Sequence, residues 1–535
     1  MAQTTTIDDV IIIGAGVSGL AAANFLQKYT ENVKIKMLEA KGRCGGRVLG
    51  KKLSTANGTE SFDLGGQWFA STQKNVVRLL EEHGLETYKQ YTDGKTMNIL
   101  DKGKKFYTND LLDVTLDALP HIYDLVRGFK KFDDLAQMIS IEDPMSHPSA
   151  REWDSMTMET AKNWLFFTQA CRKLLDLSVL SVFGLHPRQV SFLYVLMYFK
   201  CGGGCASMLD DTFEGNAQEY KVKGGMFQLV DRLADCIRHE NILTNTPVTK
   251  IDMSEEGICR IGTLDGQTFA SKYVILTIPP HLRSKIEFSP PLPCYHSKFI
   301  EHQHPGHLIK FVATYERRFW VDHGLSGLTF HWPFYEMETP HPVHITFDAT
   351  TTLGSPAILG FIEGSFGDRT AAELEEGILR SLVLFFGPDA ETPMDLVVQN
   401  WEKEPYNGGC PVDFSAPGAI SLYGDVWLRK PFYNVHFAGT ESATIWRGLI
   451  DGAIQSGQRA AIEILQKMDP DYHHSVLKYK DVFLPGTEHA YKLPYYVLNG
   501  LILCAGVLVM GCVAWSVHSR VITFNGINER LIKMF

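Results

Sequence analysis

The pattern of apolar and polar positions alternates between short β-rich runs and stretches with helical periodicity. Residues 10–14 form a continuous apolar run, which predicts a buried strand, and residues 14–19 (GAGVSG) predict a tight turn. Residues 20–29 have the pattern of a helix, and residues 33–38 that of a second strand. This order predicts a βαβ nucleotide-binding unit and an α/β architecture.

The periodicity changes several times along the chain, which predicts two interleaved domains. Helical periodicity dominates between residues 78 and 210, nucleotide-domain patterns return near 224–225 and 274–280, and 306–400 has the pattern of strands and hairpins. A strand, a turn and a long helix are expected over 435–465. We predict a Rossmann-type dinucleotide domain in three parts, 1–85, 221–300 and 401–465, and an α+β substrate domain with a helical part, 86–220, and a sheet part, 301–400.

Composition and charge narrow the class of protein. The chain has 535 residues, of which 45% are hydrophobic and 21% charged, so it can form more than one packed unit. The formal net charge of -10 argues against nucleic-acid binding, and a small-molecule enzyme fits better. The ten cysteines are scattered, which indicates reduced thiols, and Cys201 and Cys205 lack further ligands at the spacing of a zinc site, so no metal is expected.

An uncharged apolar segment near the end of the chain predicts a membrane anchor. Residues 495–517 contain no charged side chain and as a helix would span roughly 34 Å, enough to cross a bilayer. A buried core helix is the alternative, but a core helix this long is rarely apolar all round. Residues 466–494 are expected to be a tether and 518–535 a short tail. No secretory signal is visible in the polar start of the chain, MAQTTTIDD.

The glycine-rich turn carries the first chemical signal. Gly14, Gly16 and Gly19 stand between a predicted strand and a predicted helix, where amide groups and the helix terminus can meet a pyrophosphate. Glu39, twenty residues after Gly19, is placed to accept ribose hydroxyl groups. The motif therefore predicts dinucleotide binding, but it does not distinguish NAD from FAD.

Further sequence blocks decide between NAD and FAD. Gly45-Gly46-Arg47, Gly65-Gly66 and residues 437–461 (FAGTESATIWRGLIDGAIQSGQRAA) resemble those of the flavin-dependent amine oxidases, and the chain is most similar to the monoamine oxidases over essentially its whole length. The resemblance implies an FAD cofactor with Glu39 at the adenosine ribose. The other residues that it implies near FAD are Arg43, Gly46, Arg47, Gly65, Gly66, Val248, Trp401, Gly439, Thr440 and Glu441.

Two residues are expected to act directly on the flavin. A helix that begins near Gly448 would offer amides and a partial positive charge to a reduced flavin, and Ile450 is the predicted donor. Cys410, in the sequence YNGGCP, matches the cysteine that monoamine oxidases join to the flavin ring through sulfur. The resemblance thus implies covalent FAD, whereas an isolated buried cysteine would be a small apolar filler.

Two further residues are implied at the catalytic centre. Lys310, in GHLIKFVATY, matches the family lysine that holds a water molecule next to flavin N5, and an ammonium group on so apolar a strand suggests an inward placement. The alternative is a strand lysine that faces solvent. Gln218 matches a residue that touches substrate in the family.

Departures from the family pattern are equally informative. Monoamine oxidases place two tyrosines face to face in front of the flavin, and the corresponding positions here are Pro411 and Leu449. An apolar slot remains, but recognition of the amine by π faces is lost. Either the pocket is rebuilt for another amine, with Tyr406, Phe414 or an aromatic residue of 319–335 substituting, or the protein retains flavin with little turnover.

The resemblance implies oxidative deamination of an amine by hydride transfer to flavin N5, with O₂ reduced to H₂O₂. A polyamine or amino-acid oxidase, or a flavin-bearing scaffold or sensor, is the alternative. The anchor and the resemblance imply the mitochondrial outer membrane with the catalytic part facing the cytosol, or alternatively the endoplasmic reticulum. A homodimer would be in keeping with the family.

Overall fold

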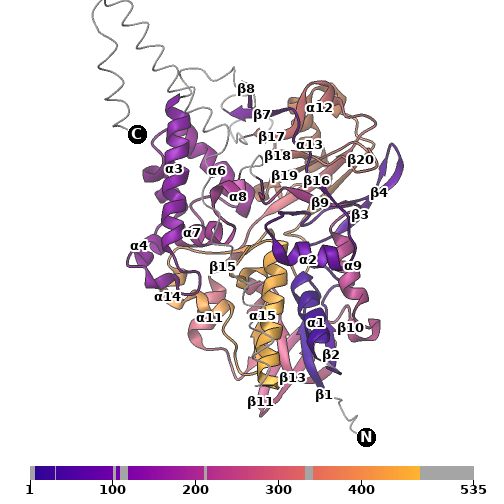
Figure 1. Ribbon diagram of the computed structural model, residues 1–535, viewed down its shortest axis with the longest axis vertical. Coiled ribbons are helices and arrows are strands. Elements are labelled where there is room, and N and C mark those ends of the chain that lie inside the picture. The colour runs from indigo at the N-terminus through magenta and orange to yellow at the C-terminus, as the bar shows by residue number, and fades with distance from the viewer. Residues whose placement is uncertain are drawn as a thin grey trace, which may run out of the picture.

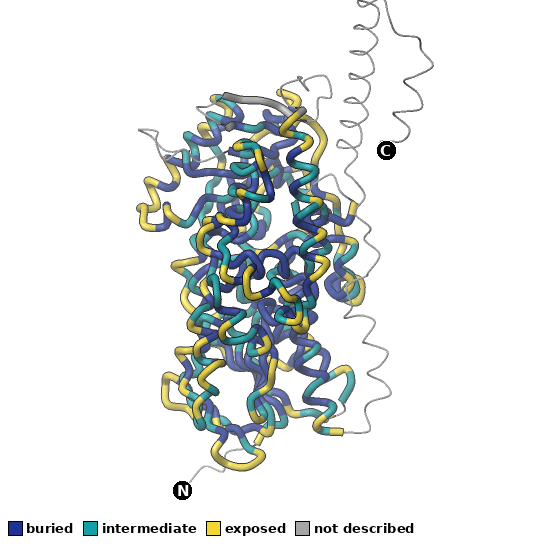
Figure 2. The backbone as a smooth tube through the Cα atoms, turned by 90° about the vertical axis from the view of Figure 1, so that its left-hand side faces the viewer, coloured by how far each residue is buried: buried dark blue, intermediate teal, exposed yellow. Residues whose placement is uncertain are grey.

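Two large sheets and a group of helices make up the described part of the chain (Figure 1). The computed structural model describes residues 7–30, 32–100, 104–108, 119–209, 214–331 and 341–469. Figure 2 shows that buried residues run through the centre of the molecule, while exposed residues gather at turns.

The first sheet is assembled from strands that are far apart in sequence. Its order is β10-β2-β1-β13-β12-β11-β14, and β22 pairs with β13. The central strands β2, β1, β13 and β22 pair in parallel, as expected for a nucleotide-binding sheet. The strands are β1 (Ile7–Ile13), β2 (Ile35–Leu38), β10 (Ile242–Leu243), β11 (Val248–Glu255), β12 (Ile258–Thr263), β13 (Thr268–Leu276), β14 (Glu287–Ser289) and β22 (Val435–Phe437).

Helices α1 (Val17–Tyr29) and α15 (Ile450–Met468) pack against each other beside this sheet (Figure 1). Gly457 permits the close approach, because a Cβ there would lie 2.0 Å from the Ser18 carbonyl oxygen. The Ser18 and Ser456 hydroxyl groups share a hydrogen bond of 3.1 Å across the contact. Helices α2 (Lys74–Glu82) and α9 (Phe227–Asp235) contact α15 and α1, respectively.

The second sheet has the order β20-β16-β19-β18-β17-β7-β8. One face of β16 carries Ile309 and Phe311 into a core shared with α13 (Ala371–Phe386), and the other carries Lys310 and Val312 toward the first half of the chain. The strands are β7 (Lys95–Leu100), β8 (Lys104–Thr108), β16 (Leu308–Thr314), β17 (Leu325–His331), β18 (Val343–Asp348), β19 (Ala357–Glu363) and β20 (Asp395–Asn400).

Small sheets and short helices connect these units. The small sheets pair β3 (Gly50–Thr55) with β4 (Gly58–Asp63), β9 (Tyr220–Val222) with β5 (Trp68–Phe69) and β6 (Thr87–Lys89), and β15 (Gln303–Pro305) with β21 (Asp413–Ser415). The helices are α3 (Leu119–Met138), α4 (Ala150–Ser155), α5 (Met158–Leu165), α6 (Gln169–Phe183), α7 (Phe192–Cys201), α8 (Cys205–Leu209), α10 (Pro280–Arg283), α11 (Cys294–Glu301), α12 (Phe319–Asp322) and α14 (Ala419–Tyr423).

The mixed α/β architecture is confirmed, but two regions differ from the sequence prediction. The region expected to be helical contains strands β6, β7 and β8. Strands β7 and β8 form an antiparallel hairpin, and β7 also pairs with β17, more than two hundred residues away, which joins the hairpin to the second sheet. The region expected to form strands and hairpins contains α13, whose amino terminus has a capping box made by Thr370 and Glu373.

The predicted tether, 466–494, begins too early, because α15 continues to Met468. The rest of the tether from residue 470, the predicted membrane anchor, 495–517, and the tail, 518–535, lie outside the described residues. Within the described ranges, no helix combines the length and the apolar character needed to cross a bilayer.

Candidate active site

The glycine-rich turn joins β1 to α1 as predicted. A Cβ on Gly14 would lie 2.5 Å from Thr277 Oγ1, and one on Gly19 would lie 2.1 Å from the Gly14 carbonyl oxygen, so both glycines are required by packing. Gly16 differs, because a Cβ there would meet only the Cα of Gly46, at 3.9 Å. Gly16 is also the N-cap of α1 and makes no side-chain cap, which leaves the helix terminus available to an anion.

Glu39 stands directly after β2, at the edge where the sheet faces the turn. Its Oε2 accepts a hydrogen bond of 2.7 Å from the Ala15 amide, and its Oε1 accepts one of 2.9 Å from the Lys41 amide. Burial raises the pKa of this carboxyl above its usual value. The side chain is thus held beside the glycine turn, where the sequence predicted a ribose contact.

Arg43 and Val248 are the next two residues that the sequence placed near FAD. Arg43 donates to the Gly46 carbonyl of its own loop at 3.1 Å and pairs with the distant Glu404 at 3.5 Å. Val248, the first residue of β11, is half-buried against the far side of the sheet. That both residues lie near FAD stays a prediction.

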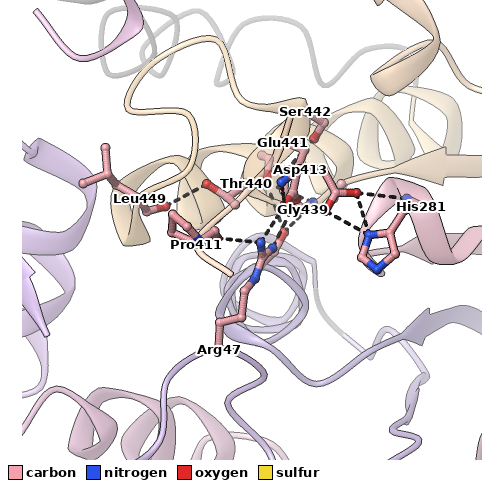
Figure 3. Close-up of polar contacts among 12 residues, drawn as sticks. Arg47, His281, Pro411, Asp413, Gly439, Thr440, Glu441, Ser442 and Leu449 are labelled. Atoms are coloured by element: carbon pink, nitrogen blue, oxygen red, sulfur yellow. Dashed lines mark hydrogen bonds and ion pairs between the residues drawn. The ribbon is translucent and has the colours of Figure 1, made fainter. Parts of the chain in front are cut away.

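A buried ion pair links two of the glycine-containing blocks (Figure 3). Arg47 Nη1 donates to Glu441 Oε1 at 2.6 Å and to the Pro411 carbonyl at 2.8 Å. Burial acts to raise the pKa of the Glu441 carboxyl, but Arg47 more than offsets it and the pKa lies below the usual value. The sequence placed Arg47 and Glu441 near the cofactor separately, without indicating that they pair.

The neighbours of Glu441 connect this ion pair to α15. The Gly439 amide donates to the Ser18 and Ser456 hydroxyl groups at 3.1 and 3.2 Å. Thr440 Oγ1 donates to the Leu449 carbonyl at 2.8 Å (Figure 3). Residues 439–441 therefore fix the entry to the closing helix relative to the glycine turn.

Cys410 lies beside the beginning of β16. Its amide donates to the Gly306 carbonyl at 2.9 Å, and its Sγ lies 3.5 Å from the Leu308 carbonyl oxygen, to which the thiol donates. Burial raises the pKa of the thiol to about 12, although Arg47 and Lys310 act to lower it. The sulfur is thus protonated at neutral pH. It contacts Leu308, which stands two residues before Lys310 in β16.

Lys310 is buried, with 2% of its surface exposed, so the solvent-facing alternative is wrong. Its Nζ donates to the Gly65 carbonyl at 3.0 Å and to Gln67 Oε1 at 2.7 Å. The rings of Trp68 and Phe361 lie 5.7 and 5.8 Å from the same atom. Burial lowers the pKa of the ammonium group to about 7, against the opposing effect of Asp63.

The amino terminus of α15 faces the second glycine pair. A Cβ on Gly66 would lie 3.3 Å from the Ile450 side chain, and Ile450 is the first residue of the helix. The N-cap residue, Leu449, has no side-chain acceptor. No capping hydrogen bond from this residue therefore occupies the backbone amides of the first turn. Trp401 closes the back of this region, where its Nε1 donates to the Leu64 carbonyl at 3.1 Å.

Tyr198, on α7, is the residue that the sequence prediction missed. A Cβ on Gly448 would lie 2.5 Å from its hydroxyl oxygen, so the tyrosine stands directly beside the Gly448-Leu449 step. Burial raises the pKa of this phenol well above its usual value. Tyr198 lies in a continuous apolar run, FLYVLMYF, whose pattern predicts a buried helix but does not distinguish one aromatic position from another.

The other aromatic candidates have different surroundings. Tyr406 is 48% exposed, and Phe319 and Trp320 lie in the core between the second sheet and α13, so these three do not replace the missing tyrosines. Phe414 is buried in the same cluster as Tyr198, against which Leu449 packs, and it stays a candidate.

Gln218 is half-buried, and its backbone amide donates to Asn216 Oδ1 at 2.8 Å. Within the described part of the chain, no hydrogen bond joins its side chain to Lys310 or Cys410. Its predicted contact with substrate stays a prediction.

The residues present fit a flavin dinucleotide. Gly16 and Gly46 leave a gap that side chains would fill, and Gly66 is exposed beside Ile450. Gly65, the neighbour of Gly66, accepts a hydrogen bond from Lys310. A dinucleotide could thus extend from the glycine turn to the face of Lys310.

The fold and these residues define an oxidoreductase built around a dinucleotide cofactor. The sequence profile of the flavin-containing amine oxidoreductases matches residues 17–465, and the chain belongs to this family. The family implies FAD as the cofactor, and the protein is a flavin-containing amine oxidase.

Individual relatives agree with this assignment. Amine oxidase [flavin-containing] A of Equus caballus is 33% identical over 466 residues, which are 86% of this chain and 85% of that protein. Amine oxidase [flavin-containing] B of Homo sapiens is 33% identical over 86% of each chain. The structure of cyclohexylamine oxidase from Brevibacterium oxydans has a TM-score of 0.78 and 29% identity, and the match covers 87% of this chain and all of that one.

Proposed function

We propose that the protein is a membrane-anchored amine oxidase that holds FAD covalently through Cys410 and converts an amine, O₂ and water to an aldehyde, H₂O₂ and ammonia or a smaller amine. The bound flavin would supply the hydride acceptor, N5, and pass two electrons to O₂. The observation that carries the proposal is the position of Cys410 and Lys310 at the start of β16, opposite Gly65 and the amino terminus of α15.

The protein groups have distinct roles in this proposal. The amides at the start of α15 would offset negative charge on the bound flavin. Arg47 would lie near the pyrophosphate, Lys310 would hold a water molecule at the flavin, and Glu39 would bind the ribose. The apolar Pro411 and Leu449 exclude water and favour the neutral amine, which is the form that can react.

Covalent attachment is tested by acid precipitation of the purified protein. We expect the yellow colour to remain in the precipitate of the wild type and to appear in the supernatant of Cys410→Ser. Cys44→Ser is a matched control, because Cys44 is also incompletely buried but lies at the glycine turn. Free flavin in the wild-type supernatant would contradict the assignment to Cys410.

The substrate is the second element to test. The solved structures similar to this chain include cyclohexylamine oxidase and putrescine oxidase bound to putrescine, so a cyclic amine and a diamine join simple primary amines as probes. Arg447, close to Leu449, pairs with Asp425 at 3.6 Å and donates to the Ala443 carbonyl, which disfavours its use for the carboxylate of an amino acid.

The deciding experiment mixes each amine with the purified protein without oxygen. Loss of the flavin colour with a primary amine supports the proposed oxidase, and loss with putrescine alone indicates a polyamine oxidase. If no amine bleaches the flavin while it is bound and the fold is intact, the protein is a flavin-bearing scaffold. The replacement of both family tyrosines by Pro411 and Leu449 is the observation that favours this alternative.

The apolar residues 495–517 support the proposed membrane anchor. The mitochondrial outer membrane, a catalytic part facing the cytosol and a homodimer are proposed from the family resemblance alone. A chain that ends near residue 490 should be released by alkaline carbonate, whereas the full chain should stay with the membrane fraction. Retention of the shortened chain would contradict the anchor. Fractionation of the full chain distinguishes mitochondria from endoplasmic reticulum.

A further inference from the structure

A cavity of about 670 Å³ lies beside β16, the strand that carries Lys310. Its rim contains exposed residues such as Glu86, Thr352 and Leu353, so it opens to solvent. Its walls come from β4, β9 and α9 and from the loop that follows β18. The glycine turn and the amino terminus of α15 contribute nothing to it, so it is separate from the dinucleotide site.

The floor of the cavity is continuous with the strand that carries Lys310. Val312 and Leu359 line the cavity and are paired across β16 and β19, as are Lys310 and Phe361 one step further along the same strands. Because every second residue of a strand faces the same side, Lys310 lies on the cavity side of β16, about 7 Å along the strand from Val312. The ammonium group and the cavity are thus neighbours on one surface of the sheet.

Gln67 forms the link between them. It lines the cavity, its Oε1 accepts the hydrogen bond from Lys310, and its Nε2 is buried without a hydrogen-bond partner among the described residues. A buried donor at the wall of a polar, roomy cavity is a site for an ordered water molecule. Water in the cavity would therefore reach the group that binds Lys310.

Two buried charges stand at the same inner wall. Asp63 accepts hydrogen bonds from the amides of Met226 and Phe227 at 2.8 and 3.3 Å. Lys221 donates to the Asp348 carbonyl at 3.3 Å, with the Tyr88 ring 5.0 Å from its Nζ. Both side chains line the cavity, and both are at least nine-tenths buried.

The pKa values of Asp63 and Lys221 are both shifted toward neutral pH. Burial raises the pKa of Asp63 to about 6 and lowers that of Lys221 to about 8, close to the value of about 7 for Lys310. The groups that act on Lys310 are Asp63, Lys221 and the Cys410 thiol, and those that act on Lys221 are Asp348, Asp63 and Arg318. Groups with such values exchange protons readily near neutral pH.

We propose that this cavity is a proton-exchange chamber, in which a water molecule held by Gln67 Nε2 also contacts Lys310 Nζ and exchanges protons between that ammonium group and solvent, while Asp63 and Lys221 are positioning residues that set the charge of Lys310. The inference rests on the proposed function for the place of the flavin beside Lys310. Reduction of O₂ to H₂O₂ by an anionic reduced flavin takes two electrons and one proton from the cofactor and one further proton from solvent. The chamber supplies that second proton.

The first experiment measures proton uptake during reoxidation. The flavin is reduced with dithionite, excess reductant is removed, and the protein is mixed with oxygenated, weakly buffered solution that contains a pH-indicator dye. We expect Gln67→Leu, which removes the link, and Thr351→Trp, which fills the cavity, to slow proton uptake and flavin reoxidation together by roughly tenfold. Glu86→Gln, at the exposed rim, is the matched control and should behave as the wild type.

The second experiment needs no flavin. The stability of the wild type is compared with that of Lys310→Met as a function of pH, and the difference reports the titration of Lys310 in the folded chain. Asp63→Asn should lower the pKa obtained in this way, because it removes the carboxylate that favours the ammonium form. Lys221→Met should raise it, and this second variant serves if Asp63→Asn does not fold.

Each result either supports or overturns the inference. Unchanged proton uptake in both Gln67→Leu and Thr351→Trp overturns it, and so does a Lys310 titration that neither charge variant moves. If Gln67→Leu and Thr351→Trp slow flavin reoxidation but Asp63→Asn and Lys221→Met leave the pKa of Lys310 unchanged, the cavity passes oxygen rather than protons. That result would also overturn the inference. Because dithionite replaces the amine, a protein that oxidises no amine loses the proposed function without affecting these measurements.

Discussion

The guanidinium group of Arg47 donates a hydrogen bond to the carbonyl oxygen of Pro411, 2.8 Å away. The same group forms the ion pair with Glu441, so one side chain holds the residue after Cys410 and the block that leads into α15. The wall in which proline replaces a family tyrosine is therefore tied to the centre of the proposed cofactor site.

Arg47→Lys should weaken both flavin retention and stability. Lysine keeps the charge but cannot bind Glu441 and Pro411 through a planar fork, and we expect a loss of roughly 1–3 kcal/mol in the free energy of unfolding. Flavin content and urea denaturation provide the measurements. Arg369→Lys, at an exposed pair with Glu373, should change neither; equal behaviour of the two variants would contradict the role of Arg47.

Gly16→Ala and Gly14→Ala should separate cofactor binding from folding. A methyl group on Gly16 meets only Gly46 at 3.9 Å, so the chain should fold normally but lose flavin, because the methyl occupies the proposed phosphate position. Gly14 has a φ of 100° and would place the methyl 2.5 Å from Thr277, so this variant should lose about 1–3 kcal/mol of stability. Full flavin content in folded Gly16→Ala would refute the assignment of the turn.

Leu449→Tyr should improve the use of a primary amine. Leu449 has an extended backbone and is half-buried, so a tyrosine there can restore one π face beside the Gly448 step. We expect kcat/KM to rise by about tenfold for a neutral primary amine. Leu422→Tyr, on the exposed face of α14, is the control. An unchanged or reduced kcat/KM for every amine tested would show that the pocket has been rebuilt without a role for an aromatic group at 449.

His296 should make the protein sensitive to acid. Its ring stacks on Trp427 and contacts Phe437, and burial followed by the charge of Arg283 lowers its pKa to about 3. Between about pH 6.5 and pH 3 the unfolded chain binds a proton that the folded chain does not, so this contribution to stability is lost as the pH falls.

His296→Phe keeps an aromatic ring and removes this proton linkage. We expect the wild type to lose about 3 kcal/mol more than the variant between pH 7 and pH 4.5, because about two pH units of the window are crossed and each contributes about 1.4 kcal/mol. Urea denaturation at the two pH values measures the difference. Parallel losses in the two proteins would show that His296 is protonated in the folded state.

Local patterns were sufficient to predict the parts of the fold that depend on neighbours in sequence. The strand, turn and helix around Gly14, Gly16 and Gly19 are present because glycine geometry and apolar periodicity act over a few residues. The family blocks likewise indicated Cys410 and Lys310. The inward placement of Lys310 could be expected, since a charged side chain stands in the run LIKFVAT.

Features that depend on distant segments could not be predicted. Strand β7 joins the second sheet by pairing with β17, more than two hundred residues away, although its other partner, β8, is local. The pairing of Arg47 with Glu441 joins positions almost four hundred residues apart. Tyr198 approaches Gly448 because α7 packs beside the start of α15, and nothing in an apolar run indicates which ring will do so. The cavity beside Lys310 arises from several separate segments and has no local signature.

The contact between α1 and α15 has a consequence for biosynthesis. Ser18 and Ser456 meet across 438 positions of sequence, so the first helix to leave the ribosome waits for almost the whole catalytic region before its partner exists. The glycine-rich turn at the start of α1 is consequently completed late. Capture of the coenzyme is therefore an event of the finished polypeptide, and nascent chains that end before residue 450 should bind none.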